Sequence, residues 1–189
     1  AYIGIHACNT VLDQIEKMEN PGQDILQLKG ENKFIRSIFY FDIATIYARP
    51  YSHDSPETNL CVPLSKSTAK EDVEGLSRAT VKEVYDFIEQ DLLEAAELMK
   101  EQKSNIYGST EVCYAALARL YLYEEKNLKA IEYADKVISS GRYQLVDSEK
   151  FPTSNEMGPE VNPETIFAIK LHSSENRGTN GIGSMYHGD

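Results

Sequence analysis

The sequence is poor in the residues that disulfide frameworks and metal sites require. It has no tryptophan, three cysteines and four histidines in 189 residues. The cysteines are too few and too scattered for a Cys-x-x-Cys site, and the histidines form no His-x-x-x-His pair. We therefore expect no metal and no cofactor. Cys8 and Cys113 lie among apolar residues and are expected in the core, whereas Cys61, in a predicted loop, is either free or paired.

Positive charge is also scarce. Nineteen Lys and Arg stand against 30 Asp and Glu, which gives a net charge of −11. Because nucleic acids and anionic membrane surfaces attract clustered basic residues, this balance argues against both as partners. No apolar run is long enough to cross a bilayer, and no basic segment followed by an apolar one marks a signal peptide. The chain length suits one domain with a sizeable core.

The motifs of common catalytic sites are missing as well. No Gly-x-Ser-x-Gly segment is present. The glycine-rich stretch 178–183 lacks the Gly-Lys-Ser/Thr ending of a phosphate-binding loop, so we interpret it as a flexible loop. The acidic pairs Glu89/Asp91 and Glu124/Glu125 are expected on solvated helix surfaces rather than in a carboxylate dyad. We therefore expect no catalytic residues and no enzymatic activity.

The clearest pattern that is present lies in residues 110–141, which resemble two amphipathic helices joined by a tight turn. Apolar and small residues recur at helical spacing on one face of each half. We expect Asn127 to cap the second helix and Gly141 to end it. Small residues such as Ala118 and Ala134 fall at the offsets of a tetratricopeptide helix hairpin, and an ordinary antiparallel hairpin fits the pattern equally well.

The rest of the chain is predicted to contain further helices and a few irregular stretches. Apolar residues at helical spacing predict three more helices, at residues 1–19, 24–47 and 80–101. The last of these begins with the capping box Thr80-Val81-Lys82-Glu83. Gly30 marks either a break in the second helix or a close crossing with another helix.

Two segments lack helical periodicity. Residues 48–79 are rich in Pro, Ser, Thr and Asp, which indicates a long loop, with residues 60–64 extended and packed against the core. Residues 166–171 are β-branched and aromatic and predict a minor strand near the C-terminus. The expected fold class is therefore all-α, built from tetratricopeptide-like helical hairpins with long loops.

Three polar or aromatic residues are the candidates for special roles. Arg36 lies in a very apolar helical stretch, where a buried charge is normally paired, so we favour a salt bridge that ties helices together. Tyr51 and His53 lie in the long loop and are the candidate ligand-binding residues, because exposed loop aromatics can stack on a sugar ring or line a groove.

Several stretches together resemble the SusD/RagB family of surface glycan-binding lipoproteins from Bacteroidetes-type bacteria. Residues 30–41, Gly-Glu-Asn-Lys-Phe-Ile-Arg-Ser-Ile-Phe-Tyr-Phe, are similar to the family's GEAxFLRAxxYF helix. Residues 59–64 are similar to its LGVPL segment, with Cys61 in place of the glycine. Residues 77–92 are similar to its SRxTVxEVYxxIxxDL stretch, which is the most specific of the set.

The resemblance implies a function and a location. It implies that residues 1–189 form a single helical domain, a central fragment without the N-terminal signal region and the C-terminal part of the family. It implies outer-membrane, cell-surface location through a lipid anchor outside this sequence. It also implies capture of an oligosaccharide without catalysis, in starch or other glycan uptake, beside a SusC-like TonB-dependent transporter. The alternative is a helical-repeat module that binds a protein or peptide in its groove.

Overall fold

The fold of the chain is a stack of helices with one small sheet. A computed structural model describes residues 1–69, 74–101 and 103–170. The elements within these ranges are α1 (Tyr2–Ile15), α2 (Gln23–Tyr47), β1 (Leu60–Pro63), β2 (Arg78–Thr80), α3 (Val81–Leu98), α4 (Thr110–Tyr123), α5 (Asn127–Ser139) and a short 3-10 helix, Phe151–Glu156. The expected all-α class is confirmed.

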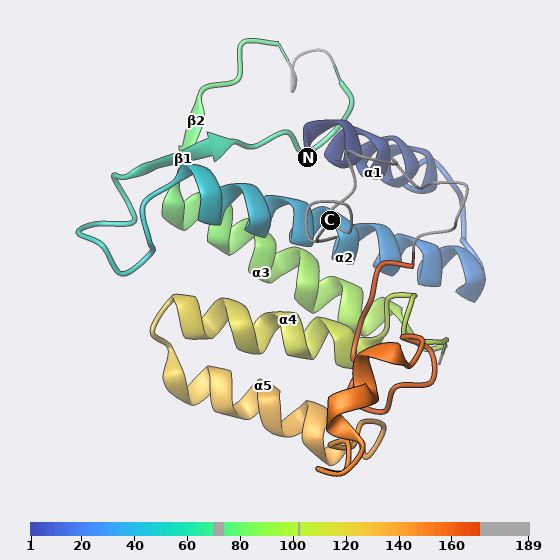
Figure 1. Ribbon diagram of the computed structural model, residues 1–189. Helices are drawn as coiled ribbons and strands as arrows, with labels where there is room; N and C mark the ends of the chain where they lie inside the picture. The colour runs from blue at the N-terminus through green and yellow to red at the C-terminus, as the bar shows by residue number, and fades with distance from the viewer. Residues whose placement is uncertain (70–73, 102, 171–189) are drawn as a thin grey trace, which may run out of the picture.

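The helices pack in chain order, each against the next, so that α1, α2, α3, α4 and α5 follow one another across the molecule (Figure 1). The core lies between them and is formed mainly by α2, α3 and α4. Its largest fully buried apolar side chains are Tyr40, Tyr121, Phe34, Ile5, Ile88, Leu92, Met99, Leu117 and Leu120. This sequential packing is typical of helical-hairpin repeats, which bury their apolar faces against neighbouring units.

Gly30 lies inside a continuous α2 and marks a close helix crossing rather than a break. A Cβ atom built at this position would lie 2.6 Å from Cγ of Met99 and 3.1 Å from the carbonyl oxygen of Ala95. Because only a hydrogen fits in this space, α2 and α3 approach each other closely here. The glycine therefore sets the distance between the two central helices.

The capping box at the start of α3 is present as predicted. The hydroxyl of Thr80 accepts a hydrogen bond from the backbone N–H of Glu83, and the Glu83 carboxylate accepts one from the backbone N–H of Thr80. The same stretch also forms β2, which pairs antiparallel with β1 across residues 60–63. The long predicted loop 48–79 is therefore only partly irregular, since it includes both short strands.

Two local predictions need correction. Residues 166–170 form no strand, because they pack against helices as a single segment: the ring of Phe167 lies 5.1 Å from that of Phe34, and the Ala168 N–H donates to Asn105 O. Residue 171 lies outside the described ranges. Helix α1 ends at Ile15 instead of continuing to residue 19.

The predicted caps of α5 are half right. Lys126 is the N-cap, without a side-chain hydrogen bond, and Asn127 is already helical. Gly141 follows the helix with a φ of 67°, the left-handed conformation expected of a terminating glycine. The apolar face of α5 is less buried than its pattern indicates, since Ile131 and Ile138 are 58% and 73% exposed.

Candidate functional site

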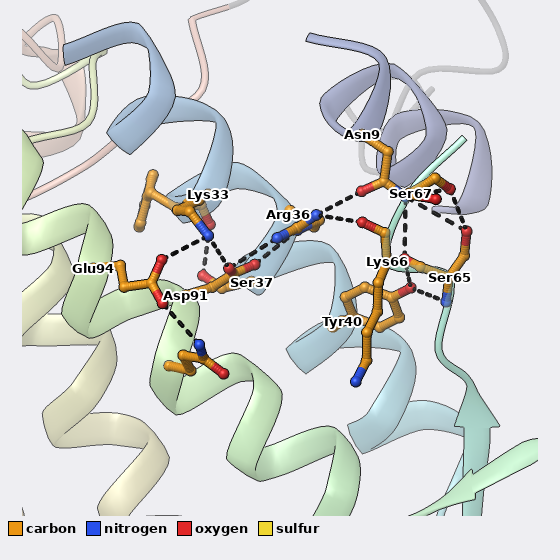
Figure 2. A network of polar contacts seen from close by, with 12 residues as sticks. Asn9, Lys33, Arg36, Ser37, Tyr40, Ser65, Lys66, Ser67, Asp91 and Glu94 are labelled. Carbon is orange, nitrogen blue, oxygen red and sulfur yellow. Dashed lines mark hydrogen bonds and ion pairs between the residues drawn. The ribbon is translucent and has the colours of Figure 1, made fainter. Parts of the chain in front are cut away.

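A buried network of charges joins the first three helices, and Arg36 of α2 is at its centre (Figure 2). Its Nε and Nη2 atoms donate to the two carboxylate oxygens of Asp91 on α3, at 2.7 and 2.9 Å. Lys33 donates to Asp91 at 3.0 Å and pairs with Glu94 at 2.9 Å. The predicted helix-to-helix salt bridge of Arg36 is therefore confirmed. Two cations face two carboxylates, so the charges of the network balance, although Glu94 is partly exposed.

The network also holds the backbone of residues 65–67, which follow β1. Arg36 donates to the Lys66 carbonyl, and Asn9 of α1 donates to the carbonyls of Ser65 and Ser67 at 3.1 and 3.3 Å. The hydroxyl of Tyr40 donates to the carbonyl of Ser65 and accepts from its N–H. In Figure 2 the Lys66 side chain extends away from these contacts. Buried side chains thus fix the path of this loop.

Two of the acidic residues that we expected on solvated surfaces are buried. Asp91 is the carboxylate of the central network, and Glu124 has a fully buried side chain at the end of α4. Lys126 pairs with one Glu124 oxygen at 2.9 Å, whereas the other oxygen, Oε2, has no hydrogen-bond partner among the described residues. Burial raises the pKa of Glu124. The prediction of exposure was wrong because the sequence pattern indicates which face of a helix a residue lies on, but not which other segment packs over that face.

Tyr51 and His53 lie in the loop that follows α2, and they differ in burial and in contacts. Tyr51 is half-buried, with its ring 5.0 Å from that of Tyr85. Burial raises the pKa of both tyrosines, that of Tyr85 to about 12. His53 is exposed, and its Nε2 lies 3.2 Å from both Arg49 and Asp54. One face of Tyr51 is therefore engaged with the core, and His53 belongs to a small exposed charged cluster.

A pocket with polar walls lies beside α3, and we call it the α3 pocket. Its volume is about 460 Å³. Its lining residues are Leu64, Lys66, Leu76, Ser77, Arg78, Ala79, Glu83, Asp86, Phe87 and Gln90. The volume falls within the range of roughly 300–1,000 Å³ that is usual for small-molecule sites. The loop held by Arg36 forms one wall, the stretch 76–79 forms another, and α3 forms the floor.

The α3 pocket was not predicted from the sequence, although one signal for it was available. Glu83, Asp86, Phe87 and Gln90 follow the spacing i, i+3, i+4 and i+7, which places them on one face of α3. That face is otherwise polar, so an aromatic residue on it is unusual. The walls come from segments far from this face in sequence, and no local pattern places them there.

A second hollow, of about 250 Å³, is apolar. It lies where α2, α3 and α4 meet, and Ile166 and Phe167 line it as well. The guanidinium of Arg119 stands 5.3 Å from the ring centre of Phe41 at this hollow. It offers few hydrogen-bonding groups, so its chemistry suits an apolar side chain better than a sugar.

Neither metal-binding nor membrane-spanning features are found in the part of the chain that the structure describes. No three His, Cys, Asp or Glu residues there are placed to hold a metal ion. No helix there is both long and apolar enough to cross a bilayer.

Cys8, Cys61 and Cys113 are buried and free. The glycine-rich stretch 178–183, for which a flexible loop was predicted, lies outside the described residues.

Comparisons with known proteins agree with this fold. A sequence profile for the SusD-like family described as "Starch-binding associating with outer membrane" matches residues 1–122. A SusD superfamily protein from Bacteroides thetaiotaomicron superposes with a TM-score of 0.83 and 27% identity, over 94% of this chain and 39% of its own. A search of curated proteins found no match.

Two Bacteroides vulgatus structures are also similar. A SusD-like carbohydrate binding protein has a TM-score of 0.69 and 32% identity, covering 78% of this chain and 32% of its own. A SusD superfamily protein has a TM-score of 0.75 and 30% identity, covering 88% of this chain and 38% of its own. The chain thus spans about two fifths or less of the length of these relatives. Since the profile spans more than half of the chain, the protein belongs to the SusD-like family.

Proposed function

We propose that the protein binds an oligosaccharide at the cell surface and does not process it chemically. The observation that carries this proposal is the match of residues 1–122 to a family described as starch-binding and associated with the outer membrane. A carbohydrate-binding relative at 32% identity supports the same ligand class. The acidic balance of the chain, with a net charge of −11, fits a neutral ligand better than a polyanionic one.

The proposal extends to location and partner. The protein acts at the outer membrane, held by a lipid anchor, and delivers its ligand to a SusC-like TonB-dependent transporter. Membership of the SusD-like family supports this assignment. Association with the transporter is tested by co-purification from the native membrane, with a tag on this protein and detection of the transporter by mass spectrometry.

Tyr51 and His53 remain proposed ligand contacts. Tyr51 is only half-buried and offers part of an aromatic ring, and His53 offers a ring nitrogen beside Arg49 and Asp54. Tyr51→Ala should weaken glycan binding without unfolding the protein. Tyr47→Ala is the matched control, because Tyr47 is an exposed tyrosine at the end of the preceding helix. Equal affinity in the two variants removes Tyr51 from the site.

The first experiment is isothermal titration calorimetry of the folded chain against maltoheptaose, a β-1,3-glucan hexasaccharide and trigalacturonate. Saturable heat with a neutral glycan supports the proposal and indicates the linkage. No heat with any neutral glycan, from protein shown by circular dichroism to be helical, contradicts it and favours a protein-interaction role. Release of shortened sugars during incubation would contradict the non-catalytic assignment.

A further inference from the structure

We propose that the α3 pocket is a subsite for one neutral sugar ring, with Phe87 as the aromatic surface on which the ring packs. The inference rests on the proposed glycan-binding function and assigns to it a place that is separate from Tyr51 and His53. The chemistry of the pocket, the rigidity of its walls and its balance of charge support it.

The pocket combines one aromatic surface with hydrogen-bonding groups, as recognition of a sugar requires. A pyranose ring has an apolar face of C–H groups and a rim of hydroxyls. Phe87 is half-buried in the α3 floor, so part of its ring lines the pocket. Glu83, Asp86 and Gln90 surround it on the same helix face, and Lys66 faces it from the loop. An aromatic surface with a few convergent polar groups is the usual composition of a small-molecule site.

The aromatic surface is held in place by the buried network. The guanidinium carbon of Arg36 lies 4.9 Å from the centre of the Phe87 ring, and the Tyr40 ring meets it edge-on at 5.5 Å. Arg36 and Tyr40 are also the residues that fix the backbone of residues 65–67. One set of buried contacts therefore positions both the floor and one wall. A preorganised site loses less conformational entropy when a ligand binds.

The polar groups of the pocket retain hydrogen-bonding capacity. The ammonium of Lys66 lies 5.6 Å from the ring centre of Phe87 and is exposed. Among the described residues it forms no salt bridge with a carboxylate, so its donors are available to hydroxyl oxygens. In Figure 2 the side chain of Lys66 extends away from the buried network. The amide nitrogen of Gln90 donates to Glu94, which leaves its carbonyl oxygen to accept from a ligand. Asp86 forms an exposed ion pair with Lys82.

The charges of the pocket indicate an uncharged ligand. Lys66 and Arg78 bring two positive charges, and Glu83 and Asp86 bring two negative ones. The Arg78 guanidinium already donates to the carbonyls of Leu60 and Cys61, which reduces its capacity to bind an anion. The four charges of the lining cancel, and Asp86 is in addition paired with Lys82, so the pocket offers no excess positive charge to hold a uronate. Neutral glycans should bind better than acidic ones.

The test compares pocket variants with matched controls by calorimetry, using maltoheptaose, a β-1,3-glucan hexasaccharide and trigalacturonate as probes. Phe87→Leu keeps an apolar contact for Arg36 but removes the aromatic face, and it should weaken binding of the neutral glycan about tenfold or more. Lys66 is exposed, so Lys66→Met should also weaken binding of the neutral glycan without affecting the fold. The controls are Phe151→Leu and Lys100→Met, an exposed aromatic and an exposed lysine that do not line the α3 pocket.

The outcomes separate this inference from the proposed function. Weaker neutral-glycan binding by both pocket variants, with melting temperatures close to those of the controls, supports the subsite. Unchanged binding by Lys66→Met and Phe87→Leu overturns the subsite while the proposed function stands. If Phe87→Leu unfolds the protein, Lys66→Met alone decides between these results. Trigalacturonate binding as tight as that of a neutral glycan overturns the assignment of a neutral ring. No binding of any neutral glycan by the unsubstituted chain overturns the proposed function and, with it, the subsite.

Discussion

Buried charged residues differ in how well the fold satisfies them. Asp91 accepts two hydrogen bonds from Arg36 and a third from Lys33, so both of its carboxylate oxygens have buried partners. Glu124 meets only Lys126 and leaves one buried oxygen without a partner among the described residues. Since an unpaired buried polar atom costs free energy, the two carboxylates should respond to substitution in different ways.

Replacing Asp91 with Asn should destabilise the protein strongly. The substitution leaves Arg36 and Lys33 buried with one counter-charge fewer, and breaking such a pair typically costs about 3–5 kcal/mol. Urea denaturation, followed by circular dichroism, measures the loss. Glu132→Gln is the control, because Glu132 pairs with Lys136 on the exposed surface of α5 and should lose less than about 1 kcal/mol. Equal effects in the two variants would show that the central network contributes no more than a surface pair.

Glu124 should make stability fall as the pH rises. Its pKa is raised in the fold by burial, beside the neighbouring carboxylates Glu89 and Asp86 and despite the pairing with Lys126. In the unfolded chain the pKa returns to about 4.5. The folded state therefore binds a proton more tightly, and this contribution is lost as the pH rises from about 4.5 through the raised value.

Glu124→Gln isolates that contribution, because the glutamine does not titrate. We expect the free energy of unfolding of the variant, relative to the parent, to increase as the pH is raised from about 4 to 7. Urea denaturation at several pH values measures the difference. A difference that stays constant with pH, or declines, would contradict the raised pKa.

At the scale of elements, helix ends and helix crossings decide where each segment lies. The capping box begins α3 directly after β2, so Thr80 is both the last residue of the sheet and the N-cap of a central helix. Gly30 allows α2 and α3 to cross closely over Met99. Both features connect α3, which carries the floor of the α3 pocket, to the rest of the fold.

Thr80→Ala should lower the free energy of unfolding by about 0.5–2 kcal/mol, because the N–H of Glu83 loses its acceptor. Thr45→Ala serves as the control, since the Thr45 hydroxyl only donates to the Asp42 carbonyl inside α2. That change should be close to neutral, because alanine favours the helix interior. Denaturation midpoints that match between Thr80→Ala and the parent would argue against the cap.

Gly30→Ala should also destabilise the protein, although alanine is the better helix former. The added methyl group would overlap Met99 and approach the backbone of Ala95. Overpacking of this kind costs about 1–3 kcal/mol, which exceeds the gain of roughly 1 kcal/mol in helix propensity. Gly158→Ala is the control, because nothing lies within 4 Å of the new Cβ. A more stable Gly30→Ala variant would show that α2 and α3 leave room for a methyl group at this crossing.

At the scale of the whole molecule, charge and shape favour a neutral ligand held at the surface. The net charge of −11 repels polyanions, and the small sheet and its following loop place polar walls beside α3. The α3 pocket and the Tyr51 loop lie on segments that flank the same helix, α3. Under the proposed function, a longer glycan would contact both segments.

The proposed glycan binding should be almost independent of salt. A neutral sugar displaces no counterions, so its affinity should change by less than about twofold between about 0.05 and 0.5 M NaCl. Calorimetric titrations with maltoheptaose at both salt concentrations provide the measurement, and trigalacturonate is the charged comparison. A steep fall in maltoheptaose affinity with salt would indicate that charge–charge contacts drive binding.

Several features followed from the sequence alone, because they depend on local spacing. The periodicity of apolar residues predicted α2 almost to the residue, and Thr80 and Glu83 predicted the cap of α3. The motifs in residues 30–41 and 77–92 pointed to the SusD-like family, which the profile match confirms. An apolar helix that carries Arg36 was enough to predict a buried salt bridge, since an unpaired charge is costly there.

Only the tertiary structure decided which residues and segments distant in sequence pack against each other. Asp91 and Glu124 have acidic patterns like those of surface residues, and they are buried because other helices pack over them. The apolar stretch 166–170 forms no strand because it lies against Phe34 as a single segment. The α3 pocket depends on the contact between residues 64–66, 76–79 and one face of α3. Such contacts depend on the packing of segments distant in sequence, which a local pattern does not encode.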